Sequence, residues 1–388
     1  MGKFGQRTEV ADICIYSAQY PPHVGGVEQF SSRLATCLAG MGHTITIVTN
    51  ATDSEPGLFR DGALEVYRLP CAPLLNGRMP LPLFGACRFA LLKQLSDRHY
   101  DGVLVNTRFY FHSLLGMKMA RKQGIAPVVL DHGSAYLTFG NTILDLFVRF
   151  YEHAITFIGK RYRPLYCGIS HKSTEWLKSF HIQSCGVVRN AIDAESFLSA
   201  SSDRDFRGEL DLSEGTFIVS YAGRLIPEKG ILSLLSAVSS LRDKGVPLAL
   251  IIAGSGPLES EVVAASGVYY LGRLESDDLA AMLSQSDCFC LPSRSEGFAT
   301  CVMESFACAT PVVATKVGGA EDLIVEGQSG HFLQSMSAED VERGLLWAYD
   351  HRSDLDEMGK CCFETVKKKC TWESTASSLL NVMGIPCD

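Results

Sequence analysis

Residues 293–324, SRSEGFATCVMESFACATPVVATKVGGAEDLI, contain the pattern that decides the fold. An apolar run precedes this stretch and is typical of a buried parallel strand. A polar loop with Glu296 follows, and a helix is expected from about Ala299 to Ala309. Pro311 stops that helix, and the next apolar run starts another strand. The stretch therefore predicts a strand–loop–helix–strand unit of a parallel α/β sheet.

Two carboxylates eight residues apart, Glu296 and Glu304, stand on either side of the start of this helix. Carboxylates accept hydrogen bonds from sugar hydroxyls, and free N–H groups at 297–299 would suit phosphate oxygens at a helix N-terminus. The alternative is that both are solvated charges. The strand–loop–helix setting and the glycine pair 318–319 favour a site for a ligand with both hydroxyls and phosphate.

The composition describes an ordinary soluble protein. The 388 residues, 46% hydrophobic and 20% charged, fit two domains better than one. No apolar run approaches the roughly 20 residues of a membrane span, and none precedes the first expected strand. The 14 cysteines are scattered without a C-x-x-C pair, which excludes a zinc framework and a secreted disulfide scaffold. We therefore expect reduced thiols and a cytoplasmic location.

The net charge of −8 is unevenly distributed. Residues 1–190 contain 20 Lys and Arg against 13 Asp and Glu, a charge of +7, whereas residues 191–388 contain 15 against 30, a charge of −15. A basic first half suits an anionic partner such as a phospholipid surface or a pyrophosphate-linked acceptor. A chance imbalance is the alternative, and no nucleic-acid partner is expected.

Strands and helices alternate through the first half, which predicts a parallel sheet. Gly25 and Gly26 precede the first expected helix and would let the backbone approach a ligand, although they do not form G-x-G-x-x-G and a ligand-free tight turn is the alternative. His132 follows an expected strand, where open α/β sheets bind ligands, although a lone histidine in a turn is usually structural. The expected strands are 12–17, 44–49, 102–106 and 127–131, and the expected helices are 27–39 and 111–122.

Two further segments need an interpretation. Residues 141–163, NTILDLFVRFYEHAITFIGKRYR, read as an amphipathic helix whose basic end (Lys160, Arg161 and Arg163) suits a membrane interface. A helix packed on the core with a charged end is an equal alternative. The polar segment 199–214 reads as an interdomain linker.

The second half repeats the alternation after a strand at 217–223. Arg224 and Lys229 lie in the loop between this strand and a helix at 231–243, so two cations and a helix N-terminus can converge on a pyrophosphate. A solvated loop with incidental charges is the alternative. Further expected units place glycines after strands, at 254 and 272, and the last 50 residues read as helical.

Together these motifs resemble glycosyltransferase family 4, the retaining group with the GT-B fold that includes bacterial-type polysaccharide and glycolipid glycosyltransferases. The match covers most of the chain: Gly25-Gly26-Val27-Glu28, Gly223-Arg224-Leu225 with Glu228-Lys229-Gly230, Ala253 to Pro257, Ser295 to Phe298 with Glu304, and Pro311 to Glu321. The resemblance implies two doubly wound Rossmann-like parallel-sheet domains that face each other across a cleft. Residues 1–190, with a C-terminal helix at about 372–388 packing back, would bind the acceptor, and residues 191–371 would bind a nucleotide-sugar.

The resemblance also implies roles for individual residues. Arg224 and Lys229 would neutralise the donor diphosphate, Glu304 would receive the ribose hydroxyls, and Glu296 would contact the transferred sugar. His132 would lie beside that sugar, which completes an expected catalytic set of Arg224, Lys229, Glu296 and His132. Family members often have a second glycine after the phenylalanine, where this chain has Ala299. The expected donor-binding residues are Gly25, Gly26, Gly223, Arg224, Lys229, Gly254, Gly272, Arg273, Gly297, Phe298, Ala299 and Glu304.

The resulting expectation is a retaining glycosyltransferase that uses a UDP-sugar rather than a GDP-sugar. Its acceptor would be a saccharide or a lipid-linked saccharide in surface polysaccharide or glycolipid assembly, reached from the inner face of an anionic membrane. No D-x-D-like sequence stands at a strand end, so we expect no cofactor and no metal. A nucleotide-sugar 2-epimerase of the same fold and a non-catalytic nucleotide-sugar binding protein are the alternatives.

Overall fold

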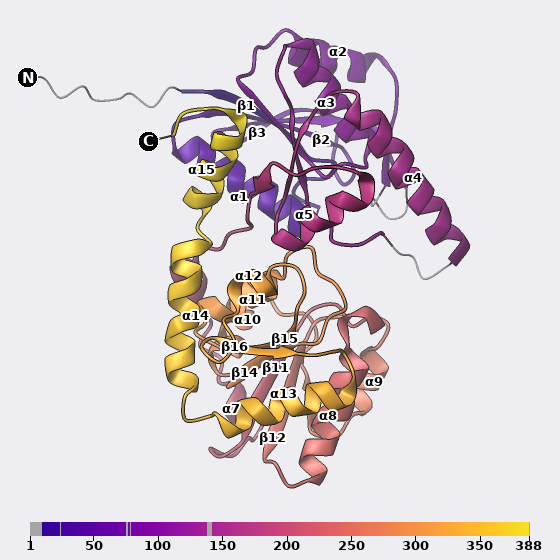
Figure 1. The fold of residues 1–388 in the computed structure, drawn as a ribbon. Coiled ribbons are helices and arrows are strands. Elements are labelled where there is room, and N and C mark those ends of the chain that lie inside the picture. Colours follow the sequence, from indigo (N-terminus) through magenta and orange to yellow (C-terminus); the bar gives the residue numbers. More distant parts are fainter. Residues whose placement is uncertain (1–9, 24, 75–76, 78, 138–141, 388) are drawn as a thin grey trace, which may run out of the picture. The chain divides into compact units, whose positions relative to one another are not determined.

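The computed structural model describes residues 10–23, 25–74, 77, 79–137 and 142–387. Asn141, the first residue of the expected amphipathic helix, lies outside these ranges, as do the residues before Val10. The chain divides into two compact units, one formed by Met1–Asn190 with Trp372–Asp388 and the other by Ala191–Thr371 (Figure 1).

The first unit is built on an eight-stranded sheet in the order β10-β9-β8-β7-β1-β2-β4-β3. All neighbours are parallel except β3 and β4, and β5 and β6 form a separate antiparallel pair. The buried strands consist largely of Val, Ile and Leu, as in sheets that are covered on both faces. The strands are β1 Asp12–Tyr16, β2 Thr44–Asn50, β3 Gly57–Asp61, β4 Leu64–Leu69, β5 Cys71–Leu74, β6 Met79–Pro82, β7 Gly102–Asn106, β8 Val128–Asp131, β9 Leu165–Gly168 and β10 Gly186–Val187.

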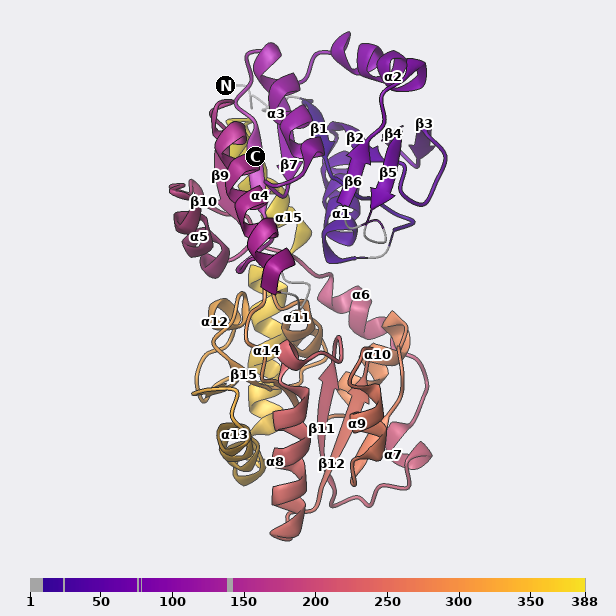
Figure 2. The ribbon, with the colours of Figure 1, turned by 90° about the vertical axis from the view of Figure 1, so that its right-hand side faces the viewer.

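Helices of the first unit cover its sheet, and the last helix of the chain returns to it (Figure 2). This helix, α15, packs against α1, where the rings of Phe30 and Trp372 are 5.8 Å apart. The helices are α1 Gly26–Gly40, α2 Ala86–Ser96, α3 Phe111–Lys122, α4 Thr142–Lys160, α5 His171–Leu177, the 3₁₀ turn η1 Lys178–Phe180 and α15 Trp372–Met383.

The second unit has a six-stranded parallel sheet in the order β13-β12-β11-β14-β15-β16. The direction of winding reverses between β11 and β14, which is the switch point of a Rossmann-like sheet. This reversal places the loops after β11 and β14 side by side. The strands are β11 Phe217–Ala222, β12 Leu248–Ala253, β13 Val268–Tyr270, β14 Cys288–Leu291, β15 Val312–Thr315 and β16 Gly330–Leu333.

Helices lie on both faces of this second sheet (Figure 1). α8 and α13 pack together on one face, and α10, α11 and α14 lie on the other. The helices are α6 Ala194–Ser199, α7 Phe206–Glu209, the 3₁₀ turn η2 Pro227–Lys229, α8 Ile231–Asp243, α9 Glu259–Ala264, α10 Ser276–Ser284, α11 Thr300–Ala307, α12 Ala320–Leu323, α13 Ala338–Asp350 and α14 Leu355–Lys369.

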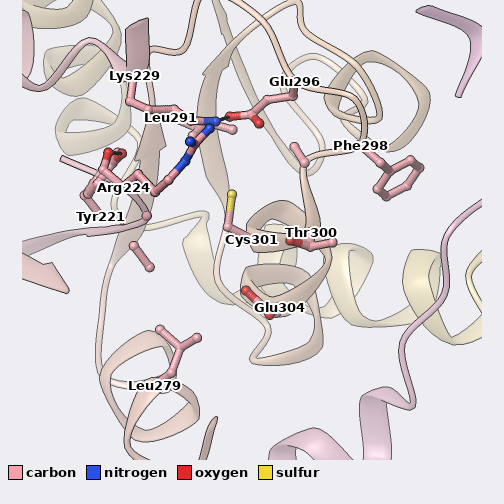
Figure 3. Close-up of a pocket in the computed structure, with 13 residues that line it drawn as sticks. Tyr221, Arg224, Lys229, Leu279, Leu291, Glu296, Phe298, Thr300, Cys301 and Glu304 are labelled. Atoms are coloured by element: carbon pink, nitrogen blue, oxygen red, sulfur yellow. Dashed lines mark hydrogen bonds and ion pairs between the residues drawn. The ribbon is translucent and has the colours of Figure 1, made fainter. Parts of the chain in front are cut away.

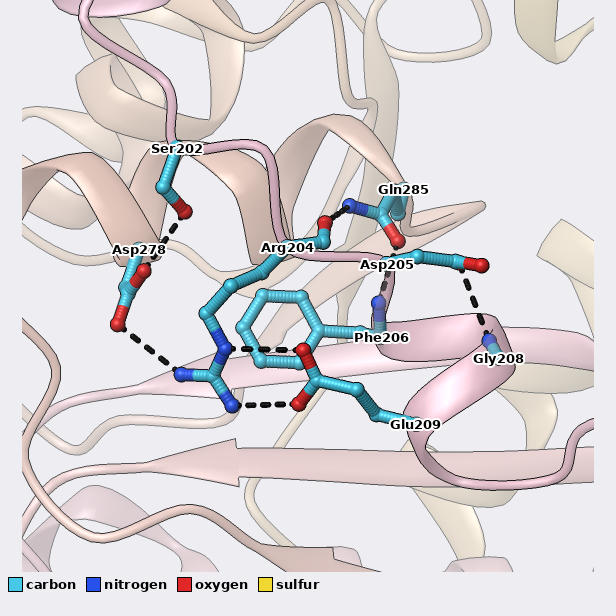
Figure 4. Close-up of polar contacts among 8 residues, drawn as sticks. All are labelled: Ser202, Arg204, Asp205, Phe206, Gly208, Glu209, Asp278 and Gln285. Carbon is cyan, nitrogen blue, oxygen red and sulfur yellow. Dashed lines mark hydrogen bonds and ion pairs between the residues drawn. The ribbon is translucent and has the colours of Figure 1, made fainter.

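The interpretation of residues 199–214 as a linker is wrong, because this segment packs on the second unit (Figure 4). Arg204 donates to both carboxylate oxygens of Glu209, at 2.6 and 3.1 Å, and to Asp278 of α10 at 3.0 Å. Phe206 is fully buried beneath the Arg204 guanidinium. Arg204 and Glu209, two of the charges that made the segment look solvated, are therefore paired beside a buried aromatic side chain.

Candidate functional site

A pocket of about 280 Å³ lies in the second unit, at the carboxyl ends of β11 and β14 (Figure 3). This is where an open α/β sheet binds ligands, because the two neighbouring loops diverge at the switch point. The pocket brings together seven residues that the sequence predicts for donor binding or catalysis: Gly223, Arg224, Lys229, Glu296, Phe298, Ala299 and Glu304.

The loop after β11 presents two cations to the pocket. Tyr221 is buried at the end of the strand and donates from its hydroxyl to the Arg224 carbonyl at 3.1 Å, which fixes the start of the loop. The Arg224 side chain is exposed and forms no salt bridge in the described part of the chain. The loop is tied to the one after β14, because the Arg294 N–H donates to the Glu228 carbonyl at 2.8 Å.

Lys229 and Glu296 form an ion pair inside the pocket, and each side chain is only 13% exposed. Figure 3 shows the Arg224 guanidinium pointing toward this pair from the same side as Lys229. Two cations therefore converge beside one carboxylate. The two cations carry one positive charge more than Glu296 neutralises, so the group can attract an anion.

Glu304 lies on the inner side of α11, away from the ion pair (Figure 3). Within the described residues its carboxylate has no hydrogen-bond or ion-pair partner, and desolvation raises its pKa from 4.5 to about 7. A half-buried carboxylate that lacks a partner is costly to keep. It can be satisfied by a ligand that donates hydrogen bonds, as vicinal hydroxyls do.

The prediction of a free N–H group before α11 is wrong at Ala299. The Ala299 N–H donates to the Gly318 carbonyl at 2.9 Å, because the glycine pair comes very close to this loop. A Cβ added at Gly318 would lie 2.2 Å from the Glu296 carbonyl. The Phe298 N–H has no acceptor in the described part of the chain, so it can still bind a phosphate oxygen.

Six pocket residues were not predicted from the sequence: Tyr221, Ala222, Leu279, Leu291, Thr300 and Cys301. Tyr221 looks like any strand aromatic, and only the structure shows that its hydroxyl holds the Arg224 backbone. Cys301 lies between Glu296 and Glu304, and burial with these two carboxylates raises its pKa well above the usual range. The thiol is therefore neutral at physiological pH. Its place at the first turn after an E-G-F loop is the only sequence signal for it.

Four predicted donor-binding residues of the second unit do not line this pocket. Gly254 and Gly272 instead meet each other, because the Gly254 N–H donates to the Gly272 carbonyl at 2.6 Å. Gly254 has φ +142°, and a Cβ there would lie 1.8 Å from the Gly223 carbonyl. The glycine thus shapes the loop that ends at Arg224. Arg273 is exposed beside Gly272, and Gly297 lies in the loop between Glu296 and Phe298.

The remaining predicted residues belong to the first unit. His132 directly follows β8, and its Nε2 lies 3.0 Å from Asn106 Oδ1 at the end of β7. Desolvation lowers the pKa of His132 to about 3, so the imidazole is neutral. Gly25 caps α1 without a side-chain bond, and a Cβ there would lie 2.2 Å from Glu28 Oε2. A side chain at position 25 would therefore require the Glu28 carboxylate to shift, whereas Gly26 has open space around it.

No group of three or more His, Cys, Asp and Glu with metal-binding geometry occurs among the residues that the structure describes. All fourteen cysteines are free. No helix in the described ranges is both long and apolar enough to cross a bilayer.

Comparison with known proteins identifies the family. A family model described as "Glycosyltransferase Family 4" matches residues 24–196, and one described as "Glycosyl transferases group 1" matches residues 202–361. The chain is 26% identical to a component of human phosphatidylinositol N-acetylglucosaminyltransferase, over 82% of this chain and 65% of that protein. It is 25% identical to D-inositol 3-phosphate glycosyltransferase of Arthrobacter sp. (strain FB24), over 87% of this chain and 84% of that protein. It is 25% identical to a GDP-mannose-dependent alpha-mannosyltransferase of Corynebacterium glutamicum, over 95% of this chain and 87% of that protein.

Solved structures show the same fold. Sucrose-phosphate synthase from Thermosynechococcus elongatus superposes with a TM-score of 0.73 at 19% identity, over 96% of this chain and 98% of that one. Anabaena HepE in complex with UDP-glucose superposes with a TM-score of 0.69 at 16% identity, over 96% and 99%. With both Rossmann-like units matched by family models, the chain belongs to glycosyltransferase family 4 and is a GT-B transferase, of the kind that takes its sugar from a nucleotide-sugar.

Proposed function

We propose that the protein is a retaining glycosyltransferase that moves a sugar from a UDP-sugar to a lipid-linked or free saccharide. The pocket at the β11–β14 switch point carries this proposal. It offers two cations beside a paired carboxylate, and a carboxylate without a partner on the opposite side. In a bound nucleotide-sugar, the diphosphate would contact the two cations and the sugar would contact the paired carboxylate of Glu296. The ribose hydroxyls would donate hydrogen bonds to the unpaired carboxylate of Glu304.

The chemical task is to let a nucleoside diphosphate leave an anomeric carbon. The carbon–oxygen bond to the phosphate breaks, the acceptor oxygen bonds to the same carbon, and the acceptor proton passes to the departing phosphate. Negative charge develops on the phosphate, so Arg224 and Lys229 are the groups placed to stabilise it. We assign no carboxylate as a nucleophile, and retention would then follow from attack on the face that the leaving group departs from.

The ion pair between Lys229 and Glu296 suggests how donor binding prepares the site. A donor phosphate competes for the lysine ammonium, which frees the Glu296 carboxylate to accept hydrogen bonds from sugar hydroxyls. His132 is neutral and hydrogen-bonded, so in our proposal it contacts the sugar as a neutral hydrogen-bonding group rather than as a charge.

The donor nucleotide and the acceptor are the finer parts of the proposal. UDP is supported by the fold shared with a UDP-glucose complex, whereas one relative is named for GDP-mannose. An acceptor linked to lipid phosphate is supported by the +7 charge of residues 1–190 and by relatives named for phosphatidylinositol and inositol phosphate. We place the enzyme in the cytoplasm, at the inner face of the membrane, and independent of metal.

One experiment separates the proposal from its alternatives. The full chain is incubated with UDP-glucose, UDP-N-acetylglucosamine or GDP-mannose and with a membrane lipid extract. Release of a nucleoside diphosphate together with a labelled lipid supports the transferase. An epimerised sugar still attached to its nucleotide would identify an isomerase instead. Tight donor binding without turnover would leave only a binding protein.

A further inference from the structure

One side of α4 exposes an unusual amount of apolar surface. Ile143, Leu146, Phe147, Phe150 and Phe157 are each between 65% and 83% exposed. Their spacing of three, four and seven residues places them on one face of the helix. We call these five residues the α4 apolar face. Large exposed apolar patches on soluble proteins mark interaction surfaces, because leaving them in water is unfavourable.

The opposite side of α4 is anchored in the first unit, so the exposed face is a fixed feature of the fold. Val148 and Ile155 are buried. Glu152 is buried and bonds to Arg108 at 2.7 Å, and Arg108 also bonds to Asp131 at 2.6 Å. A helix with one side fixed by a buried ion network cannot turn its aromatic residues inward.

The charges of the helix indicate what covers the face. Its exposed residues include no carboxylate, because Asp145 is half-buried and Glu152 is buried. Arg149 and Arg161 are exposed. Exposed aromatic rings with arginines and without acids suit an anionic bilayer, where the rings enter the acyl boundary and the guanidinium groups meet phosphates.

The structure corrects part of the sequence prediction for this helix. Lys160 was expected to face a membrane, but its ammonium donates to the carbonyl oxygens of Phe180 and His181 and so closes the end of η1. The basic end therefore offers only Arg161 and Arg163. The apolar face is much larger, so insertion must supply more of the binding than charge does.

We propose that α4 lies in the interface of an anionic bilayer and inserts its apolar face among the lipid chains. This inference rests on the proposed lipid-linked acceptor, because it gives the first unit a reason to stay at the membrane. A helix of this kind enters the boundary between head groups and acyl chains and does not span the bilayer. The bound enzyme would meet its acceptor in the plane of the membrane.

The test measures binding of the full chain to vesicles of phosphatidylcholine and phosphatidylglycerol. Phe150→Ser should weaken binding about tenfold, because it removes one inserted ring. Phe89→Ser is the matched control, since Phe89 is 64% exposed on α2 of the same unit and should bind like wild type. Both variants should bind UDP like wild type, which shows that the second unit is intact.

Vesicle binding at high salt distinguishes insertion of the α4 apolar face from electrostatic attraction to anionic lipids. At about 1 M salt the screening length is about 3 Å, so purely electrostatic binding disappears. The affinity difference between wild type and Phe150→Ser should persist there, whereas the effect of Arg161→Ser should vanish. Wild-type binding by Phe150→Ser, or an equal loss in Phe89→Ser, would overturn the assignment.

A second copy of the chain is the competing occupant. Sedimentation without lipid tests it, and a dimer that Phe150→Ser dissociates would overturn the membrane proposal. Failure of the proposed function looks different, because it would appear as no release of nucleoside diphosphate with any donor while vesicle binding remains. Transfer to a soluble acceptor without any vesicle binding would refute the membrane inference and leave the transferase standing.

Discussion

Replacing Glu304 by glutamine should change how both donor binding and stability depend on pH. The Glu304 carboxylate has no partner in the described part of the chain, and its pKa is raised from 4.5 to about 7. In our proposal it accepts hydrogen bonds from the ribose, which only the ionised form does with both oxygens. Donor affinity should therefore fall as the pH drops below about 7.

The size of both effects, on donor affinity and on the free energy of unfolding, follows from the raised pKa of Glu304. If only the ionised form binds well, affinity falls by up to about tenfold for each pH unit below the pKa, which is about 1.4 kcal/mol. The folded state holds the Glu304 proton more tightly than the unfolded chain does, so the free energy of unfolding falls as pH rises from about 4.5 to 7. A shift of this size corresponds to at most about 3 kcal/mol. Glu304→Gln should remove this loss and be more stable than wild type at pH 8, but not at pH 4.

Two measurements check these expectations. Calorimetric titration with UDP-glucose between pH 5.5 and pH 8 gives the affinity, and UDP-glucose is preferable to UDP because a terminal phosphate itself titrates near pH 6. Urea unfolding at pH 4 and pH 8 gives the stability. Glu304→Gln should bind more weakly at pH 8 and show little dependence on pH. A wild-type affinity that stays constant over this range, or a variant that keeps the wild-type dependence, would refute the reasoning.

Four other outcomes are expected. Arg224→Ala should lower kcat/KM by the equivalent of about 2–4 kcal/mol, and near wild-type turnover would exclude its role at the leaving phosphate. Glu296→Ala should mainly lower kcat, because it removes a contact to the transferred sugar. UDP affinity should be largely kept, because Lys229 loses its partner and becomes available to the phosphate. A loss of UDP affinity as large as that in Glu304→Ala would contradict this expectation. Activity should survive EDTA, whereas complete loss restored by magnesium or manganese would show a metal requirement. Arg108→Met should lower the free energy of unfolding by about 3–5 kcal/mol in urea, because Asp131 and Glu152 would remain buried without their cation.

The sequence predicted the alternating core well. The helices at 111–122 and 231–243 and the strand at 102–106 have the expected bounds, because buried parallel strands are short and apolar and are separated by clear helix signals. The short strands β3, β5 and β6 were not predicted. Exposed residues and prolines make them resemble loops. Each is held by antiparallel pairing with a neighbouring strand of the chain, β3 with β4 and β5 with β6.

The candidate site could be predicted where a motif stays together in the chain. Arg224, Lys229, Glu296 and Glu304 follow strand ends, and parallel strands bring such ends to one edge. The ion pair between Lys229 and Glu296 joins residues 67 positions apart, so no local sequence pattern predicts it. Arg108 and Glu152 are similar: each reads as an exposed charge until the fold buries both.

The N–H group of Ala299 affects how the charge on the leaving diphosphate is stabilised. The residue after Phe298 is often glycine in the family, but here it is a buried alanine whose N–H is already bonded to the Gly318 carbonyl. One backbone donor before α11 therefore cannot bind a phosphate. With fewer N–H groups to share the charge that develops on the leaving diphosphate, Arg224 and Lys229 must stabilise more of it. For this reason we expect the loss in Arg224→Ala to lie toward the upper end of its range.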